Sequence, residues 1–259
     1  DTAISNVGST TSITNSGAIV NNSVVGNGVL NTGTIASLTN SGSVNVGASG
    51  VGIKNAVFLP QPNNNNLVVI SSLTNSGTIT VGSQGRGILN YGVIGTLTNS
   101  GTITGGGQAQ GVAGTGGLPN ESYYSTIGTL NNTGSIIVGD SGFAISNLGK
   151  IDSLINSGLI QAGASAYGIS SIRDILTLNN SGRISAGAFG VAITFSYGRI
   201  NALTNSGTIV SGGDGVVFSS SAQVSTIVNS GSITAGSLGS GIGNSASIGT
   251  LTNSGVITS

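Results

Sequence analysis

The chain has 259 residues, 46 of them Gly, and its six acidic residues balance six basic residues, so its formal net charge is zero. Such a chain has no basic surface to hold nucleic acid or an anionic membrane, and no apolar run reaches the roughly 20 residues that span a bilayer. Cys, His, Met and Trp are absent, which excludes disulfides, a thiolate nucleophile, a zinc cluster and an imidazole base. We therefore expect no cofactor, no metal site, no nucleic-acid partner and no direct membrane insertion of this segment.

One phrase, Asn-Ser/Thr-Gly, recurs along the whole chain. Its Ser or Thr is found at Ser16, Ser41, Ser76, Ser100, Thr133, Ser157, Ser181, Ser206, Ser230 and Ser254. The period is nearly constant along the chain, apart from two longer spacings that follow Ser41 and Ser100. The chain is therefore built from ten units of one repeat, and the two longer spacings indicate insertions of about ten residues.

Ile, Val and Leu recur at four places in each unit, between Gly-rich turns. Leu or Ile stands two residues before the turn Asn, Ile or Val stands four residues after it, and Ile or Val stands three residues before the Leu. The fourth place is held by Ile53, Ile88, Val112, Ile145, Ile169, Ile193, Val217 and Ile242. The segments between turns have three to five residues and are rich in β-branched residues, which is typical of strands.

These spacings predict an all-β fold, a right-handed single-stranded parallel β-helix. We expect three short strands per coil and about ten coils of 24–25 residues. Each coil would hydrogen-bond to the next, and the four apolar columns would stack into one dry core. The chain is expected to form a single β-helix domain over 1–259, with loop insertions near 58–67 and 113–125.

The Asn of the turn phrase is present in every unit: Asn15, Asn40, Asn75, Asn99, Asn132, Asn156, Asn180, Asn205, Asn229 and Asn253. Amides stacked at strand spacing can donate and accept along the axis, so this column predicts a structural Asn ladder. A second, incomplete column consists of Asn6, Asn55, Asn90, Asn147 and Asn244. The Gly of the phrase, as at Gly17, Gly42 and Gly77, is expected to adopt a positive φ that a side chain would penalise.

Residues suited to recognition are concentrated in the two insertions. The insertions hold all three prolines, the only Glu and three of the ten aromatic residues. The candidate partner-binding residues are Phe58, Pro60, Pro62, Asn64, Pro119, Glu121, Tyr123 and Tyr124. Both insertions leave the coil at the same point, two coils apart, so we expect them about 10 Å from each other along one edge. Insertions on one face of a solenoid often form its binding face, and tolerated loop growth is the alternative.

The charged residues offer little material for catalysis. The acids are Asp1, Glu121, Asp140, Asp152, Asp174 and Asp214, spread over several corners. Lys150, Asp174 and Arg199 occupy the same place in three consecutive units, which predicts an alternating column of surface ion pairs. A carbohydrate-active enzyme, the remote alternative, would use Asp152 and Asp174 as a carboxylate pair for general acid–base chemistry. We expect no catalytic residues and no enzymatic activity.

The two ends of the chain fall near the same point of the coil. Ile4-Ser5-Asn6 matches Ile53-Lys54-Asn55, and the chain stops at the end of a later strand, at Ile257-Thr258-Ser259. Neither end carries a charged or Pro-rich cap against edge pairing. We therefore expect end-to-end contacts through Ile4, Asn6, Ile257 and Ser259, and an open contact of this kind yields a filament. A fragment of a longer solenoid would have the same ends.

The repeat phrase also resembles a known family. Strings such as IGTLTNSGTIT, residues 94–104, together with the phrase Gly-x-Gly-Ile-x-Asn, resemble the passenger domains of Gram-negative autotransporters across all ten units. The resemblance implies a parallel β-helix at the bacterial cell surface that acts in adhesion, aggregation or biofilm formation. The partner would be the protein itself or a protein or glycan of a host or cell surface. A self-assembling extracellular fibre subunit that stacks head to tail is the alternative function.

Overall fold

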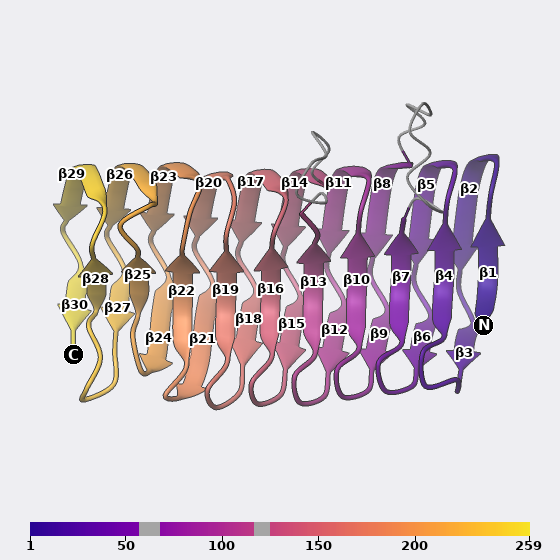
Figure 1. The fold of residues 1–259 in the computed structure, drawn as a ribbon, viewed down its shortest axis with the longest axis horizontal. Coiled ribbons are helices and arrows are strands. Elements are labelled where there is room, and N and C mark those ends of the chain that lie inside the picture. Colours follow the sequence, from indigo (N-terminus) through magenta and orange to yellow (C-terminus); the bar gives the residue numbers. More distant parts are fainter. Residues whose placement is uncertain (57–67, 117–124) are drawn as a thin grey trace.

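The computed structural model describes residues 1–56, 68–116 and 125–259. The chain winds as a three-sided parallel β-solenoid, in which each strand pairs with the equivalent strand of the neighbouring coils (Figure 1). As the chain passes from the right to the left of the view, the nearer strands run upward and the farther strands run downward, so the winding is right-handed (Figure 1). The predicted β-helix, with three strands per coil and ten coils, is confirmed.

The coils place their strands in three ten-stranded sheets, which we name A, B and C. Sheet A contains β1 (Thr2–Asn6), β4 (Asn27–Asn31), β7 (Val51–Asn55), β10 (Arg86–Asn90), β13 (Gln110–Gly114), β16 (Phe143–Asn147), β19 (Tyr167–Ser171), β22 (Val191–Phe195), β25 (Val216–Phe218) and β28 (Ile242–Asn244). Sheet B contains β2 (Ser9–Asn15), β5 (Thr34–Asn40), β8 (Val69–Asn75), β11 (Val93–Asn99), β14 (Thr126–Asn132), β17 (Lys150–Asn156), β20 (Ile175–Asn180), β23 (Arg199–Asn205), β26 (Gln223–Asn229) and β29 (Ser247–Asn253). Sheet C contains β3 (Ala18–Asn21), β6 (Ser43–Val46), β9 (Thr78–Val81), β12 (Thr102–Gly105), β15 (Ser135–Val138), β18 (Leu159–Ala162), β21 (Arg183–Ala188), β24 (Thr208–Gly212), β27 (Ser232–Thr234) and β30 (Val256–Thr258).

Coil 1 consists of β1 to β3, and each later coil consists of the next three strands. Three edges separate the sheets. At the A–B edge, the upper edge in Figure 1, a sheet A strand leads into sheet B. Sheet B leads into sheet C at the B–C edge, and the C–A edge, the lower edge in Figure 1, carries the chain to the next coil.

The four apolar columns form most of the buried core, and a further column in sheet C, which includes Val46, Val81, Val138 and Ala162, is buried beside them. Ile103, for example, pairs in register with Ile79 on one side and with Ile136 on the other, and all three are fully buried. Because the parallel neighbour of each residue is its own equivalent, one apolar place in the repeat becomes a continuous buried stripe. One expected core residue is wrong, because Val216 and not Val217 pairs with Ile193 and is buried.

The Gly of the turn phrase is needed for a reason other than the expected one. Among the described residues the Gly with a positive φ is Gly198, at 79°, which is not part of the phrase. A Cβ added at Gly101 would instead overlap the carbonyl oxygen of Gly77 in the preceding coil, and the same overlap recurs along the column. The prediction of a positive φ is therefore wrong. Glycine is required because the stacked turns approach too closely for a side chain.

Candidate functional surface

The predicted Asn ladder lies at the B–C edge, on the inside of the coil. From Asn15 to Asn253, each Nδ2 donates to the Oδ1 of the next Asn, over nine hydrogen bonds of 2.7–2.8 Å. The amides also donate to backbone carbonyls of the next coil, as Asn99 does to Ser135 at 3.1 Å. The eight Asn side chains between the two end members are buried. The ladder is confirmed, and its inner amides are satisfied by one another, out of reach of a ligand.

A second ladder follows the A–B edge over the first four coils. Asn6 donates to Asn31, Asn31 to Asn55, and Asn55 to Asn90, at 2.7–2.8 Å. Asn31 is a further member of this column that was not predicted, although its spacing of 25 residues from Asn6 and 24 residues from Asn55 could have identified it. Sequence spacing alone would therefore have completed this part of the column.

Beyond coil 4 the second column changes character. Gly114 takes the place of the next Asn, and Asn147 donates to the hydroxyl of Ser171 at 3.0 Å. The following two places are held by Phe195 and Phe218, which are fully buried and stack with ring centroids 5.6 Å apart. Aromatic rings thus replace amides in coils 8 and 9. The predicted member Asn244 lies beyond them in register and is exposed.

Both insertions leave the solenoid at the A–B edge. One lies in the sequence between β7 and β8 and the other between β13 and β14, and these flanking strands are two coils apart. The candidate binding residues Phe58, Pro60, Pro62, Asn64, Pro119, Glu121, Tyr123 and Tyr124 lie outside the described residues. Their part in binding stays a prediction.

Exposed apolar side chains also lie along this edge, between the insertions and in later coils. Tyr91 is 47% exposed in the turn between β10 and β11, which lies between the two insertions. Ile172 and Tyr197, which are 41% and 55% exposed, occupy the corresponding turns of coils 7 and 8. We name Tyr91, Ile172 and Tyr197 the edge residues. They were missed in the sequence because single apolar residues in turns have no periodic pattern.

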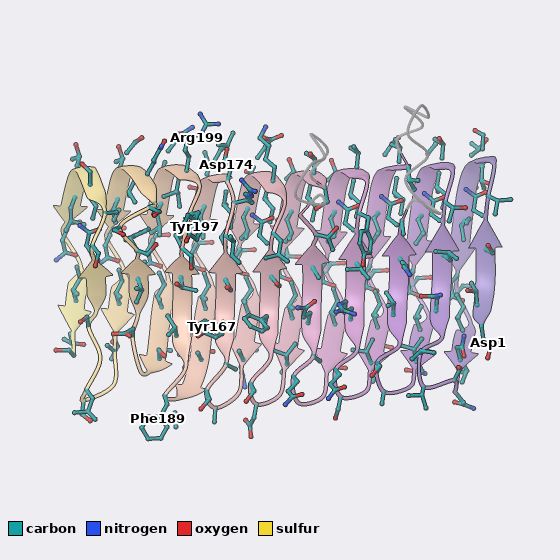
Figure 2. All side chains as sticks on the ribbon, in the orientation of Figure 1. Asp1, Tyr167, Asp174, Phe189, Tyr197 and Arg199 are labelled. Carbon is teal, nitrogen blue, oxygen red and sulfur yellow. The ribbon has the colours of Figure 1, made fainter. Side chains whose placement is uncertain are left out.

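Two ion pairs lie beside the edge residues. Arg199 Nη2 is 2.9 Å from Asp174 Oδ2, and the backbone N–H of Arg199 donates to Asp174 Oδ1 at 2.8 Å (Figure 2). Lys150 Nζ lies 2.6 Å from Asp152 Oδ1 in its own strand, so the expected alternating column is correct for Asp174 and Arg199 but not for Lys150. Exposed pairs of this kind stabilise a fold weakly. Asp152 and Asp174, the two carboxylates considered for a catalytic pair, are thus each ion-paired.

Two other described carboxylates, at the C–A edge, accept hydrogen bonds from backbone N–H groups. Asp140 Oδ1 accepts the N–H of Ala164 at 2.8 Å, and Asp214 Oδ1 accepts the N–H of Ser240 at 2.7 Å, in each case from the next turn of the C–A edge. Over residues 1–56, 68–116 and 125–259, no three potential ligand side chains are grouped closely enough to hold a metal ion. The same residues contain no helix with the length and apolar composition of a membrane span.

The fold and these surfaces define a three-sided parallel β-solenoid with an internal Asn ladder at one edge and insertions at another. Neither a protein-family model, nor a curated protein, nor a solved structure matches this chain. The class of this protein is therefore defined by its architecture.

Proposed function

We propose that this chain is a non-catalytic structural and adhesive solenoid of the bacterial cell surface, similar to the passenger domain of a Gram-negative autotransporter. The resemblance of the repeat phrase to such passengers supports the extracellular location. The stacked coils support a display role, because a continuous core and ladder hold the outer residues of every coil at fixed spacing. Adhesion to a cell-surface protein or glycan, or aggregation of displaying cells, is the activity that we infer.

One observation carries the adhesive function: both insertions in the repeat begin at the A–B edge. Both insertions, the exposed rings of Tyr91 and Tyr197, and both ion pairs lie along it. Insertions on one face of a solenoid often mark the binding face, and Tyr is enriched at the centres of protein interfaces. We therefore assign partner binding to this edge and name it the adhesive edge.

The alternative of a carbohydrate-active enzyme has less support at the same edge. Asp152 and Asp174 would have to act as the acid and the base, yet each is ion-paired with a neighbouring cation. Both carboxylates are therefore already engaged by a cation, and Asp174 also accepts the backbone N–H of Arg199. The arrangement favours a surface charge pattern over a catalytic pair.

The adhesive edge is tested with beads coated with the purified chain. Beads carrying the unmodified chain are expected to adhere to epithelial or bacterial cells, or to aggregate with one another. The double variant Tyr91→Ser/Tyr197→Ser should lower adhesion at least about threefold, because loss of central aromatic anchors costs binding energy. Deletion of residues 58–66 should also weaken adhesion while the circular dichroism spectrum keeps its β signature.

The matched control is Val25→Ser, which removes an exposed apolar side chain from the C–A edge and should leave adhesion unchanged. Equal adhesion of the unmodified chain and of albumin-coated beads would contradict the adhesive function. Depolymerisation of a glycan that is lost in Asp152→Asn and Asp174→Asn variants would establish the enzyme alternative in its place.

A second candidate, the self-assembling fibre subunit, is favoured by the polarity of the Asn ladder. Asn15 donates its Nδ2 inward to Asn40, which leaves its Oδ1 as the acceptor at the first coil. Asn253 accepts from Asn229 and donates to Gly255 of its own turn, so its Nδ2 is the donor at the last coil. Coil 10 of one copy stacked on coil 1 of another would continue the ladder in the same direction. The predicted contacts Ile4, Asn6, Ile257 and Ser259 lie in these two coils.

Negative-stain microscopy of residues 1–259 tests this second candidate. We expect filaments of constant width at high protein concentration, because stacking pairs the open strands of coils 1 and 10. Leu251→Lys places a charge on the half-exposed end of the core and should abolish the filaments, whereas Tyr197→Lys, on the side of the rod, should not. Isolated short rods from the unmodified chain at every concentration would contradict end-to-end assembly.

A further inference from the structure

A notch interrupts the row of turns along the C–A edge. Six residues, 187–192, separate Ala186 from Ile193, but four residues, 212–215, separate their strand partners Ser211 and Val216. Counted between these paired residues, the connection from β24 to β25 is therefore two residues shorter than the connection from β21 to β22, and a register shift between Ala186 and Ala188 accounts for part of the difference. On the other side, seven residues, 235–241, separate the strand partners of Val210 and Val216, against five residues, 211–215, in the short turn. Figure 1 shows the β24–β25 turn ending above its two neighbours.

The short turn leaves a hollow of about 210 Å³ between the turns on either side. Its walls are Phe189, from the β21–β22 turn, and Leu238, from the β27–β28 turn, and its floor is Gly212, Gly213 and Asp214. Phe189 is 79% exposed and projects from the lower edge in Figure 2, and Leu238 is 95% exposed. Two coils separate the walls, or about 9.6 Å, which leaves room for one layer of side chain between them.

Phe189 departs from the pattern of its column. Six non-Gly residues among those described have a positive φ, of 51–61°, one in each of six consecutive turns of this edge: Ser49, Gln84, Gln108, Ser141, Ser165 and Phe189. A bulky side chain in this left-handed conformation is unusual, whereas small polar residues tolerate it better. The first five donate their N–H to a carbonyl of the next turn at 2.7–2.9 Å. The N–H of Phe189 has no such partner in the described chain, because the next turn is too short to supply it.

The carboxylate of Asp214, at the floor of the notch, can accept further hydrogen bonds. Asp214 Oδ1 accepts the N–H of Ser240, and the carboxylate makes no ion pair with the described part of the chain. Asp140 is the matched case at the same edge, since it makes the same bond to the next turn. In the turns before and after that of Asp140, the residues with a positive φ are Gln108 and Ser165, whereas Asp214 shares its hollow with Phe189 and Leu238. Of these two carboxylates, Asp214 is the one that lies between apolar walls.

We propose that this notch binds an arginine side chain of a partner polypeptide, which stacks between Phe189 and Leu238 and pairs with Asp214. A guanidinium is planar, weakly hydrated and stacks on aromatic faces, so it matches a narrow slot with an aromatic wall and a carboxylate floor. An ammonium holds its water more strongly and gains less from such walls. The unpartnered N–H of Phe189 adds a donor for a carbonyl of the same polypeptide. The inference is independent of the function assigned to the adhesive edge.

The probe is the capped tripeptide acetyl-Gly-Arg-Gly-amide, titrated into ¹⁵N-labelled protein while amide chemical shifts are recorded. We expect saturable shifts at Gly212, Gly213 and Ser240, with a dissociation constant of about 1 mM for so small a ligand. The tripeptides with citrulline, which is neutral, or with lysine in place of arginine should bind at least about tenfold more weakly. Equal binding of the citrulline tripeptide, equal binding of the lysine tripeptide, or shifts that do not saturate would each overturn the proposal.

Three variants locate the site. Asp214→Asn keeps an acceptor for Ser240 and removes the charge, and Phe189→Ser restores the residue type found at Ser165; each should weaken arginine binding at least about tenfold. Asp140→Asn removes the same charge from a turn without apolar walls and should leave binding unchanged. An equal loss in Asp140→Asn, or full binding by both Asp214→Asn and Phe189→Ser, would overturn the proposal. Phe189→Ser keeps the test decisive if Asp214→Asn disturbs its turn.

Discussion

Replacing Asn99 with Ala is expected to lower the free energy of unfolding by about 3 kcal/mol. The substitution removes the bonds that Asn99 accepts from Asn75 and donates to Asn132 and to the carbonyl of Ser135. The Oδ1 of Asn132 then stays buried without its donor, and an orphaned buried acceptor costs more than the bond itself contributes. Urea unfolding followed by circular dichroism measures the loss.

Asn253→Ala is the matched control, because it removes the same amide from an exposed end of the ladder. Asn253 accepts from Asn229 and donates to Gly255; without it, Asn229 Nδ2 keeps its bond to the Val256 carbonyl, and water can bond Gly255 at the exposed end of the ladder. The expected loss is under about 1 kcal/mol. Equal losses from Asn99→Ala and Asn253→Ala would show that the ladder bonds of the inner coils do not stabilise the solenoid.

Gly101→Ala is expected to destabilise the protein by a similar amount, about 3 kcal/mol, through overpacking. The added Cβ would overlap the carbonyl oxygen of Gly77. That carbonyl also accepts the N–H of Thr102 at 2.9 Å, so the turns cannot separate without weakening the pairing of coils 3 and 4. Thermal and urea unfolding of the variant should both shift to milder conditions.

Gly17→Ala makes the same change at the same place of the phrase in coil 1, where no atom lies within 4 Å of the added Cβ. We expect a change of under about 1 kcal/mol, since an open position imposes no overlap. A large loss at Gly17 as well would mean that the backbone conformation, and not the close approach of stacked turns, demands glycine in this phrase.

The core and the main ladder could be predicted from the sequence because each residue pairs with the equivalent residue of the neighbouring coil. In a parallel, in-register solenoid, the residue above Ile79 is Ile103 and the residue above Asn75 is Asn99. A separation of one repeat along the chain is therefore also a contact in space. The columns of the core and the ladder can therefore be predicted from the repeat length alone.

Features that depend on conformation within a coil could not be predicted in this way. Lys150 has a carboxylate at Asp174 in the neighbouring coil and another at Asp152 in its own strand, and only the side-chain conformation decides for Asp152. Every repeat has glycine at this place of the phrase because the stacked turns approach closely. The spacing could not reveal this reason, because a positive φ and a close approach both require glycine.

The notch does not change the repeat length, because a longer connection within the same repeat compensates for the short turn. Between paired residues, the connection from β24 to β25 is two residues shorter than the connection from β27 to β28, but four residues, 219–222, connect β25 to β26, where two residues connect β28 to β29. The spacing from Ser206 to Ser230 therefore equals the spacing from Ser230 to Ser254. Because the period is unchanged, counting along the unit places Val217 in the core, while the shifted strand buries Val216.

The sequence alone determined the coil, the sheets, the core columns and the Asn ladder, because a repeat in one dimension becomes a stack in three when its units pair in register. The tertiary structure alone decided which ion pairs form, why the turns need glycine, and where Phe189, Asp214 and Leu238 meet. These contacts depend on turn length, backbone angle and side-chain direction within single coils. The spacing of the repeat does not report those quantities. It therefore predicts the stacked columns, but not the contacts that differ from one coil to the next.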